Sequence, residues 1–375
     1  MPIQRRNSRK IRIGTVEVGG DAPVSIQSVT NTDTRDTAAT LDQINRLARL
    51  GCEIIRVAVP DEAAADALAE ITEKSPIPVI ADIHFDYRLA LRAIDRHVTA
   101  IRLNPGNLDS PEHIRLVAES AVRHEVPIRV GANTGSLRPG VIRRMMERGL
   151  SHDDAMAEAL VVSAMNECAL LQKFGVTEIK VALQLSSVPL SGAAYRKFAA
   201  RTDYPLHIGV TEAGTPGRGI VKSAVGIGAL LLEGIGDTLR VSLTAPPDEE
   251  VIAGRRILEA CGLRDASPEI VSCPTCGRTE IDLIGLANKV EELVAEIKAE
   301  GATIHLRKIA VMGCAVNGPG EARDADLGLA GSKAGKLVMF RFGEVVGAFD
   351  PEEGLEYFRL EILKHVPQGK GGKNA

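Results

Sequence analysis

The chain has 375 residues, with 45 lysines and arginines against 49 aspartates and glutamates and a formal net charge of −4. This length exceeds one compact core and indicates a large domain with a smaller one. The near balance of charge argues against a protein that binds nucleic acid or a membrane surface as a whole. Hydrophobic residues make up 45% of the chain and aromatic residues only 3%, which suits a buried parallel sheet covered by helices.

The amino-terminal segment and the cysteine content bear on location. Basic residues up to Lys10 are followed by alternating apolar positions and not by the long apolar core of a secretory signal. The longest apolar run, residues 224–232, is much too short to cross a membrane. Six cysteines in a chain of this size do not indicate a secreted disulfide framework. We therefore expect a cytoplasmic protein.

The large domain is predicted from an alternation of strand and helix patterns. The first 20 residues predict a short strand pair, and amphipathic helical patterns follow at 40–50, 61–74 and 153–174, among others. Eight β-rich runs lie between the helical patterns, at 24–28, 53–59, 78–83, 100–103, 126–130, 178–183, 205–210 and 237–243. This alternation predicts an α/β fold, a (β/α)8 TIM-type barrel over residues 1–265. A doubly wound parallel sheet is the alternative.

The pattern changes after residue 265. A helix is predicted at 283–300, a strand at 308–313, and a hairpin from strands at 336–342 and 344–349. A last helix is predicted to begin after Asp350, because aspartate is a good N-cap and the next residue is proline. We expect a smaller α+β domain at 266–366 and a disordered tail at 367–375.

Three arginines are predicted to converge at one end of the barrel. Arg56, Arg102 and Arg129 lie in apolar strands near their carboxyl ends, which line the active face of a barrel. Converging arginines repel one another unless an anion neutralises them, and their forked donors match phosphate oxygens. The alternative is that each arginine pairs with a local carboxylate or faces solvent.

Other polar residues are predicted at the same strand ends. Asp82 and His84 share one face of a strand, although His84 is equally compatible with an ordinary surface or core residue. Glu212 is a candidate general acid or base, or a residue that orients an arginine. Arg240 and Gln27 also fall at strand ends.

Three cysteines in the second domain form an incomplete metal-ligand set. Cys273 and Cys276 form a C-x-x-C motif, and Cys314 lies in a glycine-rich loop that ends at Glu321. A structural zinc site wants four closed ligands, whereas a cubane iron–sulfur cluster can take three cysteines and a weaker fourth ligand, for which Glu321 is the candidate. A structural zinc, or a reduced C-x-x-C with an unrelated thiol, stays open as the alternative.

The remaining cysteines lie at a helix–strand junction and on apolar helix faces, and we expect them to fill the core. They are Cys52, Cys168 and Cys261.

Motifs along nearly the whole chain carry a family resemblance. They lie, in order, at residues 25–32, 56–60, 81–86, 102–107, 129–136, 206–214, 232–243, 273–279 and 312–322. With these motifs the chain closely resembles the bacterial 4-hydroxy-3-methylbut-2-enyl diphosphate synthase family of the non-mevalonate isoprenoid pathway. The last motif, Met-Gly-Cys-Ala-Val-Asn-Gly-Pro-Gly-Glu-Ala, is highly specific.

The resemblance implies a complete active site. It implies a [4Fe–4S] cluster on Cys273, Cys276, Cys314 and Glu321, with Asn317 close to the reacting oxygen of the substrate. It also implies a diphosphate clamp made of Arg56, Arg102, Arg129 and Asn133. We expect Asp82, His84 and Arg240 to complete the substrate site and Glu212 to manage protons.

The same resemblance implies the reaction and the partners. The reaction is a two-electron reductive opening of a cyclic diphosphate, 2-C-methyl-D-erythritol 2,4-cyclodiphosphate, with loss of water. The family works as a homodimer in which the cluster domain of one chain covers the barrel of the other. Because the sequence has no G-x-G-x-x-G nucleotide fingerprint, we expect a flavodoxin or a ferredoxin to supply the electrons.

One position departs from the family pattern. After the sixth strand the family usually places a phosphate-binding lysine, and this chain has Gln184 instead. Glutamine donates a hydrogen bond but carries no charge. We therefore predict weaker diphosphate binding there, or compensation from Lys180 or another rim residue.

Two other functions remain possible from the sequence. One is a phosphate-binding barrel lyase or transferase similar to dihydropteroate synthase, with a structural metal in the small domain. The other is an iron–sulfur electron carrier whose barrel is a binding module. Metal and sulfide analysis separates the first from an iron–sulfur enzyme, and turnover of the cyclic diphosphate separates the second.

Overall fold

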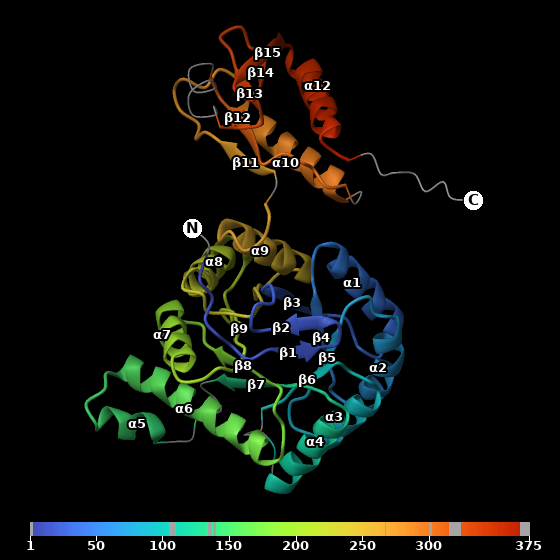
Figure 1. The fold of residues 1–375 in the computed structure, drawn as a ribbon, viewed down its shortest axis with the longest axis vertical. Helices are drawn as coiled ribbons and strands as arrows, with labels where there is room; N and C mark the ends of the chain where they lie inside the picture. The colour runs from blue at the N-terminus through green and yellow to red at the C-terminus, as the bar shows by residue number, and fades with distance from the viewer. Residues whose placement is uncertain are drawn as a thin grey trace. The chain divides into compact units, whose positions relative to one another are not determined.

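The computed structural model describes residues 3–104, 108, 110–133, 137, 140–266, 268–299, 302–314 and 324–367. The chain divides into two compact units, Met1–Arg264 and Asp265–Ala375 (Figure 1). Most of the predicted disordered tail, residues 368–375, lies outside the described residues.

Eight parallel strands form a barrel in the first unit (Figure 1). They are β3 (Ser25–Val29), β4 (Ile54–Ala58), β5 (Val79–Asp82), β6 (Ala100–Arg102), β7 (Ile128–Asn133), β8 (Ile179–Gln184), β9 (His207–Ile208) and β10 (Thr238–Leu239). Strands β3 to β8 pair in chain order, and β10 pairs with both β9 and β3. A parallel bridge between Val181 and Leu206 joins β8 to the segment that enters β9. The predicted TIM-type barrel is confirmed, and the doubly wound alternative is wrong.

Helices follow every barrel strand and cover the outside of the sheet. They are α1 (Thr37–Arg49), α2 (Glu62–Lys74), α3 (Tyr87–Asp95), α4 (Pro111–Arg123), α5 (Val141–Met146), α6 (His152–Lys173), α7 (Val188–Ala199), α8 (Pro216–Leu232) and α9 (Pro247–Ala260). Among the described residues, two helices, α5 and α6, follow β7, and one helix follows each of the other strands.

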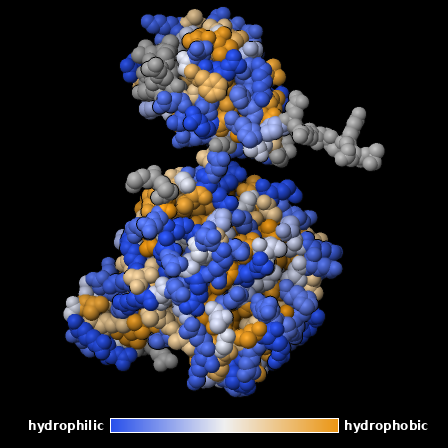
Figure 2. Space-filling model, in the orientation of Figure 1, coloured by the Kyte–Doolittle hydropathy of each residue, from blue (hydrophilic) through white to orange (hydrophobic). Residues whose placement is uncertain are grey.

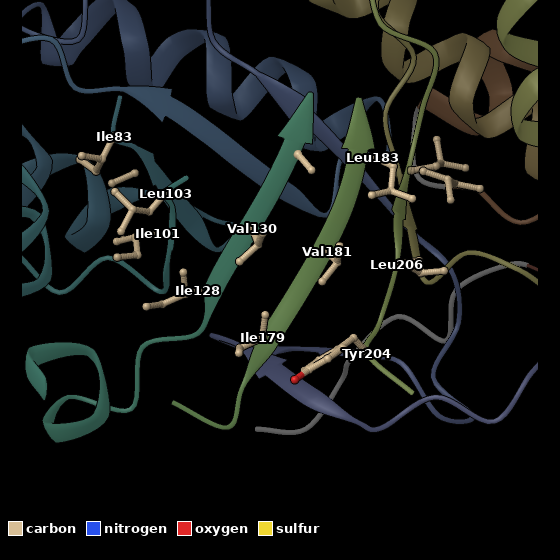
Figure 3. Close-up of a cluster of buried hydrophobic side chains, with 14 of the residues drawn as sticks. Ile83, Ile101, Leu103, Ile128, Val130, Ile179, Val181, Leu183, Tyr204 and Leu206 are labelled. Atoms are coloured by element: carbon tan, nitrogen blue, oxygen red, sulfur yellow. The ribbon is translucent and has the colours of Figure 1, made fainter. Parts of the chain in front are cut away.

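Strand alternation separates the apolar core from the polar interior of the barrel. On β7 and β8, Ile128, Val130, Ile179 and Val181 are buried in the largest hydrophobic cluster, together with outward-facing residues of β5 and β6 (Figure 3). Successive side chains of a strand point to opposite faces. The residues between these apolar positions therefore face the inside of the barrel, and they include several charged side chains.

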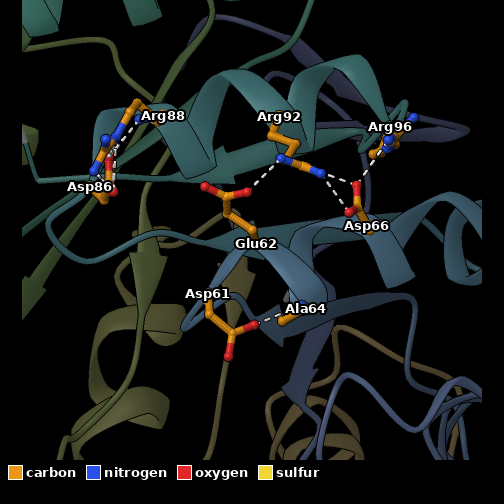
Figure 4. Close-up of polar contacts among 8 residues, drawn as sticks. All are labelled: Asp61, Glu62, Ala64, Asp66, Asp86, Arg88, Arg92 and Arg96. Atoms are coloured by element: carbon orange, nitrogen blue, oxygen red, sulfur yellow. Dashed lines mark hydrogen bonds and ion pairs between the residues drawn. The ribbon is translucent and has the colours of Figure 1, made fainter.

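Helices α2 and α3 show how the outer layer is fixed locally (Figure 4). Asp61 caps α2 by accepting a hydrogen bond from the backbone N–H of Ala64 at 2.8 Å. On the surface, Asp66 of α2 accepts hydrogen bonds from Arg92 of α3 and from Arg96, which directly follows α3. These ion pairs are exposed to solvent, so each adds little to stability.

A hairpin near the amino terminus closes the amino-terminal end of the barrel. Strands β1 (Ile11–Ile13) and β2 (Val16–Val18) pair in antiparallel fashion, as the sequence predicted. Their apolar side chains pack against Ile54, Ile80 and Ala100, which lie at or near the starts of β4, β5 and β6. The carboxyl end of the barrel is thereby left as the place for a site.

Residues before the hairpin also bind the last part of the barrel. Arg5 Nη2 lies 2.7 Å from Asp237 Oδ1, immediately before β10. Ser8 donates a hydrogen bond to the same oxygen, and the second oxygen of Asp237 accepts one from the backbone of Leu206. The first and last parts of the barrel unit are thus held together by one buried carboxylate.

The second unit contains a five-stranded mixed sheet and two helices in its described residues. In sheet order the strands are β11 (Glu269–Ser272), β12 (Lys308–Met312), β13 (Leu327–Gly331), β14 (Leu337–Arg341) and β15 (Glu344–Phe349), and the helices are α10 (Leu283–Ala299) and α12 (Pro351–Lys364). Strands β11 to β13 are parallel, while β13 to β15 are antiparallel. The helix at 283–300 and the hairpin are close to their predicted bounds, whereas β13 was not predicted.

Strand β13 escaped prediction because it is built from small residues around Gly328. The ring of Phe340 on β14 lies directly over this glycine, so an added Cβ would be 2.2 Å from Phe340 Cζ and 2.9 Å from the carbonyl oxygen of Ala310. The glycine is therefore needed for close packing within the sheet, although its type is unfavourable in strands.

Gly328→Val is expected to lower the free energy of unfolding of the second unit by about 1–3 kcal/mol, because the added methyl groups overlap a buried ring and a backbone carbonyl. Urea unfolding with hydrogen exchange on β12 to β14 measures the effect. Gly277→Ala in the same unit is the matched control, since that glycine has no atom within 4 Å of an added Cβ. Equal stability of the two variants would contradict the packing argument.

The face of the molecule shown in Figure 2 is largely hydrophilic, and its apolar residues lie in small groups. On α8, Val221, Val225 and Leu232 are exposed. No helix in the described part of the chain is long and apolar enough to cross a membrane.

Candidate active site

Charged side chains from five neighbouring strands line the inside of the barrel. Arg56, Asp82, Arg102, Arg129 and Lys180 come from β4 to β8 in order, and all are buried. Asp82 is paired in register with Arg102, Arg102 with Arg129, and Arg129 with Lys180. The structure therefore brings together the three arginines singled out in the sequence.

Asp82 is the carboxylate shared by two of these arginines. Arg102 Nη1 donates a hydrogen bond to Asp82 Oδ1 at 3.0 Å. Arg56 Nε lies 3.1 Å from Asp82 Oδ2, but its N–H does not point at the oxygen well enough to form a hydrogen bond. Burial acts to raise the pKa of Asp82, but the positive charges of Arg56 and Arg102 outweigh it and hold the pKa below its usual value. Asp82 is therefore ionised at neutral pH.

Arg129 has no carboxylate partner among the described residues. Its Nε and Nη1 atoms are buried without any hydrogen-bond acceptor. Burial, together with the nearby charges of Arg56 and Arg102, lowers the pKa of Arg129 to about 9. The pKa of Arg56 is lowered to about 10, again mainly by burial. Buried donors without acceptors are costly in a folded protein, and the fork of Arg129 matches an oxyanion.

His84 lies at the edge of this cluster. Its Nε2 atom is 3.8 Å from Asp82 Oδ1, and its Nδ1 atom is 3.4 Å from Arg102 Nη1. About half of its side chain is exposed, whereas Asp82 is buried. The structure thus brings together Asp82 and His84, with the imidazole at the solvent side of the charged cluster.

Arg240 differs from Arg129 because it has its own buried carboxylate. The guanidinium lies 3.2 Å from both carboxylate oxygens of Glu250 in the first turn of α9. Glu250 also accepts a hydrogen bond from the backbone of Leu243 at 2.9 Å. Sequence reasoning missed Glu250, although an acidic residue early in the helix after the last strand was the available signal.

Gln184 and Asn133 end neighbouring strands and are paired in register. Gly131 lies two residues before Asn133, and a Cβ there would be 3.3 Å from Arg129 Nη1 and 3.4 Å from Gln184 Oε1. The glycine thus makes room for Arg129 and Gln184. Its backbone N–H donates to Asn104 Oδ1 at 3.0 Å, and Asn104 is a site residue that the sequence prediction did not include.

A small pocket opens among these side chains. Its lining includes Arg56, Arg129, Gln184, His207 and Arg240. Lys180, which the sequence offered as compensation for Gln184, is not a rim residue, because it is 1% exposed and does not line this pocket.

Glu212 is not part of the charged cluster. It lies in the loop after β9, is exposed, and adopts a left-handed backbone conformation with a φ of 54°. Within the described residues it forms no hydrogen bond or ion pair. Its expected role in proton transfer therefore rests on its position after a barrel strand alone.

Two of the cysteine-bearing turns of the second unit follow adjacent parallel strands. Cys273 follows β11, and Cys314 follows β12 by two residues, with Ser272 and Val311 paired in register. The backbone N–H of Gly313 donates to Cys273 Sγ at 3.1 Å. Cys276 is exposed, and the pKa of its thiol is lowered mainly by a hydrogen bond from the backbone of Arg278 and, to a smaller extent, by one from the Arg278 side chain.

These features suit a thiolate-ligated metal group. The three thiols are free, backbone N–H groups can orient and tune ligating sulfurs, and a lowered pKa favours the thiolate that binds metal. The other two expected residues, Glu321 and Asn317, lie outside the described residues. Within the described parts of the chain, no three His, Cys, Asp or Glu side chains are arranged to hold a metal ion.

The other cysteines have a different environment. Cys52 and Cys168 are buried in the barrel core, and burial raises the pKa of Cys52 to about 12. Cys261 is partly exposed and packs against the same core. They remain thiols at neutral pH and act as apolar core residues, as predicted.

Comparison with known proteins covers both units. The family model described as the GcpE TIM-barrel domain matches residues 8–255, and the model described as the GcpE protein C-terminal domain matches residues 269–364. A 4-hydroxy-3-methylbut-2-en-1-yl diphosphate synthase (flavodoxin) of Geobacter sulfurreducens is 53% identical over 342 residues, which cover 91% of this chain and 93% of that protein. A protein of the same name from Clostridium acetobutylicum is 48% identical over 96% of this chain and 99% of its own length.

The matches extend through the arginine-bearing barrel and the cysteine-bearing second unit alike, and the relatives are aligned over nearly their full lengths. The dihydropteroate-synthase-like alternative gains no support from them. The chain belongs to the GcpE family.

Proposed function

We propose that the protein reduces 2-C-methyl-D-erythritol 2,4-cyclodiphosphate to 4-hydroxy-3-methylbut-2-enyl diphosphate. In this reaction the bond between carbon and the phosphate oxygen that closes the ring is broken, a hydroxyl leaves as water, and two electrons and two protons are taken up. The relatives from Geobacter and Clostridium are named for this product.

The observation that carries the proposal is the excess of buried positive charge in the barrel. Two donor nitrogens of Arg129, Nε and Nη1, have no acceptor within the described residues, while Arg56 and Arg102 share the single carboxylate of Asp82. Arg240 is already paired with Glu250. A dianionic diphosphate supplies both the missing charge and the missing acceptors, and it pairs with arginine forks in a directed way.

The barrel residues act on the substrate by binding and orientation. Arg56, Arg102 and Arg129 hold the diphosphate, and Asp82 fixes two of the three guanidinium groups before the substrate arrives. Such preorganisation reduces the cost of ordering the site when the ligand binds. We assign Asn133, His84 and Arg240 to substrate binding and Glu212 to proton transfer.

The metal group belongs to the second unit. We propose that Cys273, Cys276, Cys314 and Glu321 hold a [4Fe–4S] cluster and that Asn317 lies near the reacting oxygen. When bound there, the cluster supplies one-electron transfer and Lewis acidity. The N–H of Gly313 on Cys273 Sγ orients that ligand.

We also propose the setting of the reaction. The electrons come from a reduced flavodoxin, consistent with the names of the relatives, or from a ferredoxin. The active enzyme is a cytoplasmic homodimer, because the substrate-binding barrel and the cluster-binding unit must meet, and in this family they do so between chains.

The proposal is tested with anaerobically purified protein. Iron and acid-labile sulfide are expected in stoichiometric amounts, and the protein is expected to convert the cyclic diphosphate when dithionite or reduced flavodoxin is supplied. Zinc without iron would overturn the cluster assignment. Iron-loaded protein that binds no cyclic diphosphate and makes no product would overturn the function.

Substitution of the ligands gives a graded result. Cys314→Ala is expected to lose most of the iron and all turnover, because three thiolates are the minimum that anchors the cluster. Glu321→Ala is expected to retain much of the iron and its absorbance but lose turnover. Cys261→Ala, at a cysteine in the barrel unit, is the control and keeps both. Full activity of the Glu321 variant would remove Glu321 from the site.

A further inference from the structure

Lys180 is a buried lysine inside the barrel, on the strand next to that of Arg129 and in register with it. It shares the inward face of β8 with Ala182 and Gln184, and strand geometry places it about 13 Å before Gln184 along the strand. Only 1% of the residue is exposed. Its register partner on β7 is Arg129, which has no carboxylate partner among the described residues.

The environment of Lys180 does not suit an ammonium ion. Its Nζ atom donates one hydrogen bond, to Gln27 Oε1 on β3 at 3.2 Å, and no second acceptor lies within the described residues. An ammonium has three donors and no acceptor, so it is poorly satisfied by one neutral oxygen. The Nε2 atom of Gln27 is also buried without a hydrogen-bond partner. A neutral amine has a lone pair that can accept a hydrogen bond from such a donor, whereas an ammonium has none.

The two arginines near Lys180 act in the same direction as burial, and one carboxylate opposes them. Arg129 on β7 and Arg56 on β4 repel a proton on Nζ, while Asp237 before β10 attracts one. That carboxylate is already engaged by Arg5, Ser8 and the backbone of Leu206. His207 on β9 is buried in the same interior. Burial is the largest cause of the lowered pKa of Lys180.

We propose that Lys180 takes up a proton when the diphosphate binds and so adds a positive charge beside the arginine clamp only while the substrate is there. This inference rests on the proposed function. The barrel interior then carries this additional positive charge only when the diphosphate is bound. Burying a neutral amine costs less free energy than burying an ammonium, so the ligand-free protein is more stable with a neutral Lys180.

The proposal fixes the sign of a pH effect. A bound dianion raises the pKa of Lys180, so proton uptake is expected at pH values between its free and bound pKa. In that range the affinity rises as the pH falls, by at most about tenfold per pH unit for one proton. Below the free pKa of Lys180 the lysine is already charged, and its contribution to uptake disappears.

Isothermal titration calorimetry of the full-length protein with the cyclic diphosphate, without a reductant, measures this uptake. The cyclic diphosphate is a suitable probe because its phosphates are diester-like and do not titrate near neutral pH. Titrations at a series of pH values, each in two buffers of different ionisation enthalpy, give the number of protons bound at each pH. The wild-type protein is expected to take up a substantial part of one proton.

Two variants separate Lys180 from its surroundings. Lys180→Met removes the titrating group, so it is expected to abolish this proton uptake. It is also expected to weaken binding about tenfold, the change in affinity that one linked proton produces over one pH unit. Gln27→Glu places a carboxylate beside Nζ and holds the lysine charged in the free protein, so uptake is lost although the lysine remains. His207→Gln is the control and is expected to retain the uptake. Circular dichroism and thermal melting establish that each variant is folded.

The outcomes distinguish the inference from the function on which it rests. If the wild-type protein does not bind the cyclic diphosphate, the proposed function fails. If it binds without proton uptake at any pH of the series, or with an uptake that Lys180→Met leaves unchanged, the inference is overturned. Loss of uptake in His207→Gln alone assigns the proton to His207. Gln27→Glu with wild-type uptake also overturns it, because a lysine already charged cannot gain a proton.

Discussion

Asp82→Asn is expected to cost about 3–5 kcal/mol of unfolding free energy in the absence of a ligand, because it removes one partner of a buried ion pair. The carboxylate lies 3.1 Å from Arg56 Nε and 3.0 Å from Arg102 Nη1, and it is the neutralising group that these two arginines share. Without it, Arg56, Arg102 and Arg129 repel one another in a medium of low polarity. Chemical denaturation with and without pyrophosphate measures the effect.

Pyrophosphate is expected to stabilise the Asp82→Asn protein more than it stabilises the wild type, since the added anion replaces the lost charge. Asp66→Asn is the matched control: Asp66 also binds two arginines, Arg92 and Arg96, but on the surface (Figure 4). There the expected loss is below about 1 kcal/mol. Equal losses at both positions would contradict the assignment of Asp82 as the organiser of the arginine cluster.

The pH dependence of the wild type follows from the same carboxylate. The pKa of Asp82 is lowered by folding, so its contribution to stability is complete above its unfolded pKa of about 4 and is lost as the pH falls through the lower folded value. The difference in stability between the wild type and Asp82→Asn is therefore expected to shrink below about pH 4.

Arg129→Met is expected to change stability and binding in opposite directions. Folding lowers the pKa of Arg129 from 12.5 to about 9, which means that the buried charge is disfavoured in the folded protein. Replacing it with an apolar side chain is expected to raise the free energy of unfolding by at least about 1 kcal/mol. Affinity for the cyclic diphosphate is expected to fall about 10- to 100-fold, the value of one or two charge-assisted hydrogen bonds.

Arg240→Met supplies the comparison for this variant. Because Arg240 is paired with Glu250, its removal leaves a buried carboxylate and is expected to lower stability. Thermal melting and calorimetry on the two variants measure both effects. A loss of stability in Arg129→Met would show that Arg129 holds the fold together and would remove the argument that its free donors await an anion.

The sequence was sufficient for the barrel because its outward-facing residues are strongly apolar. Ile128, Val130, Ile179 and Val181 alternate with polar positions, and this period identifies strands with little ambiguity. The strand around Gly328 could not be predicted in the same way, because it depends on a contact with Phe340 that the period of the local sequence does not reveal.

The sequence predicted which residues line the site, but not which of them form ion pairs with one another. Strand parity places Arg56, Arg102 and Arg129 on the inner face, but it does not say that Asp82 serves the first two and leaves the third unpaired. Parity also puts Lys180 on the same face as Gln184. Its depth in the barrel, and hence its isolation from water, depends on the neighbouring strands.

The closure of the barrel has a consequence for synthesis on the ribosome. The edge of β3 is covered only by β10, and Arg5 finds its carboxylate only at Asp237. A nascent chain therefore exposes an unpaired strand edge, which is prone to pair with other chains, until well over half of its length has emerged from the ribosome. Truncation of the first ten residues should accordingly lower the yield of soluble protein more than it lowers the activity of the molecules that fold.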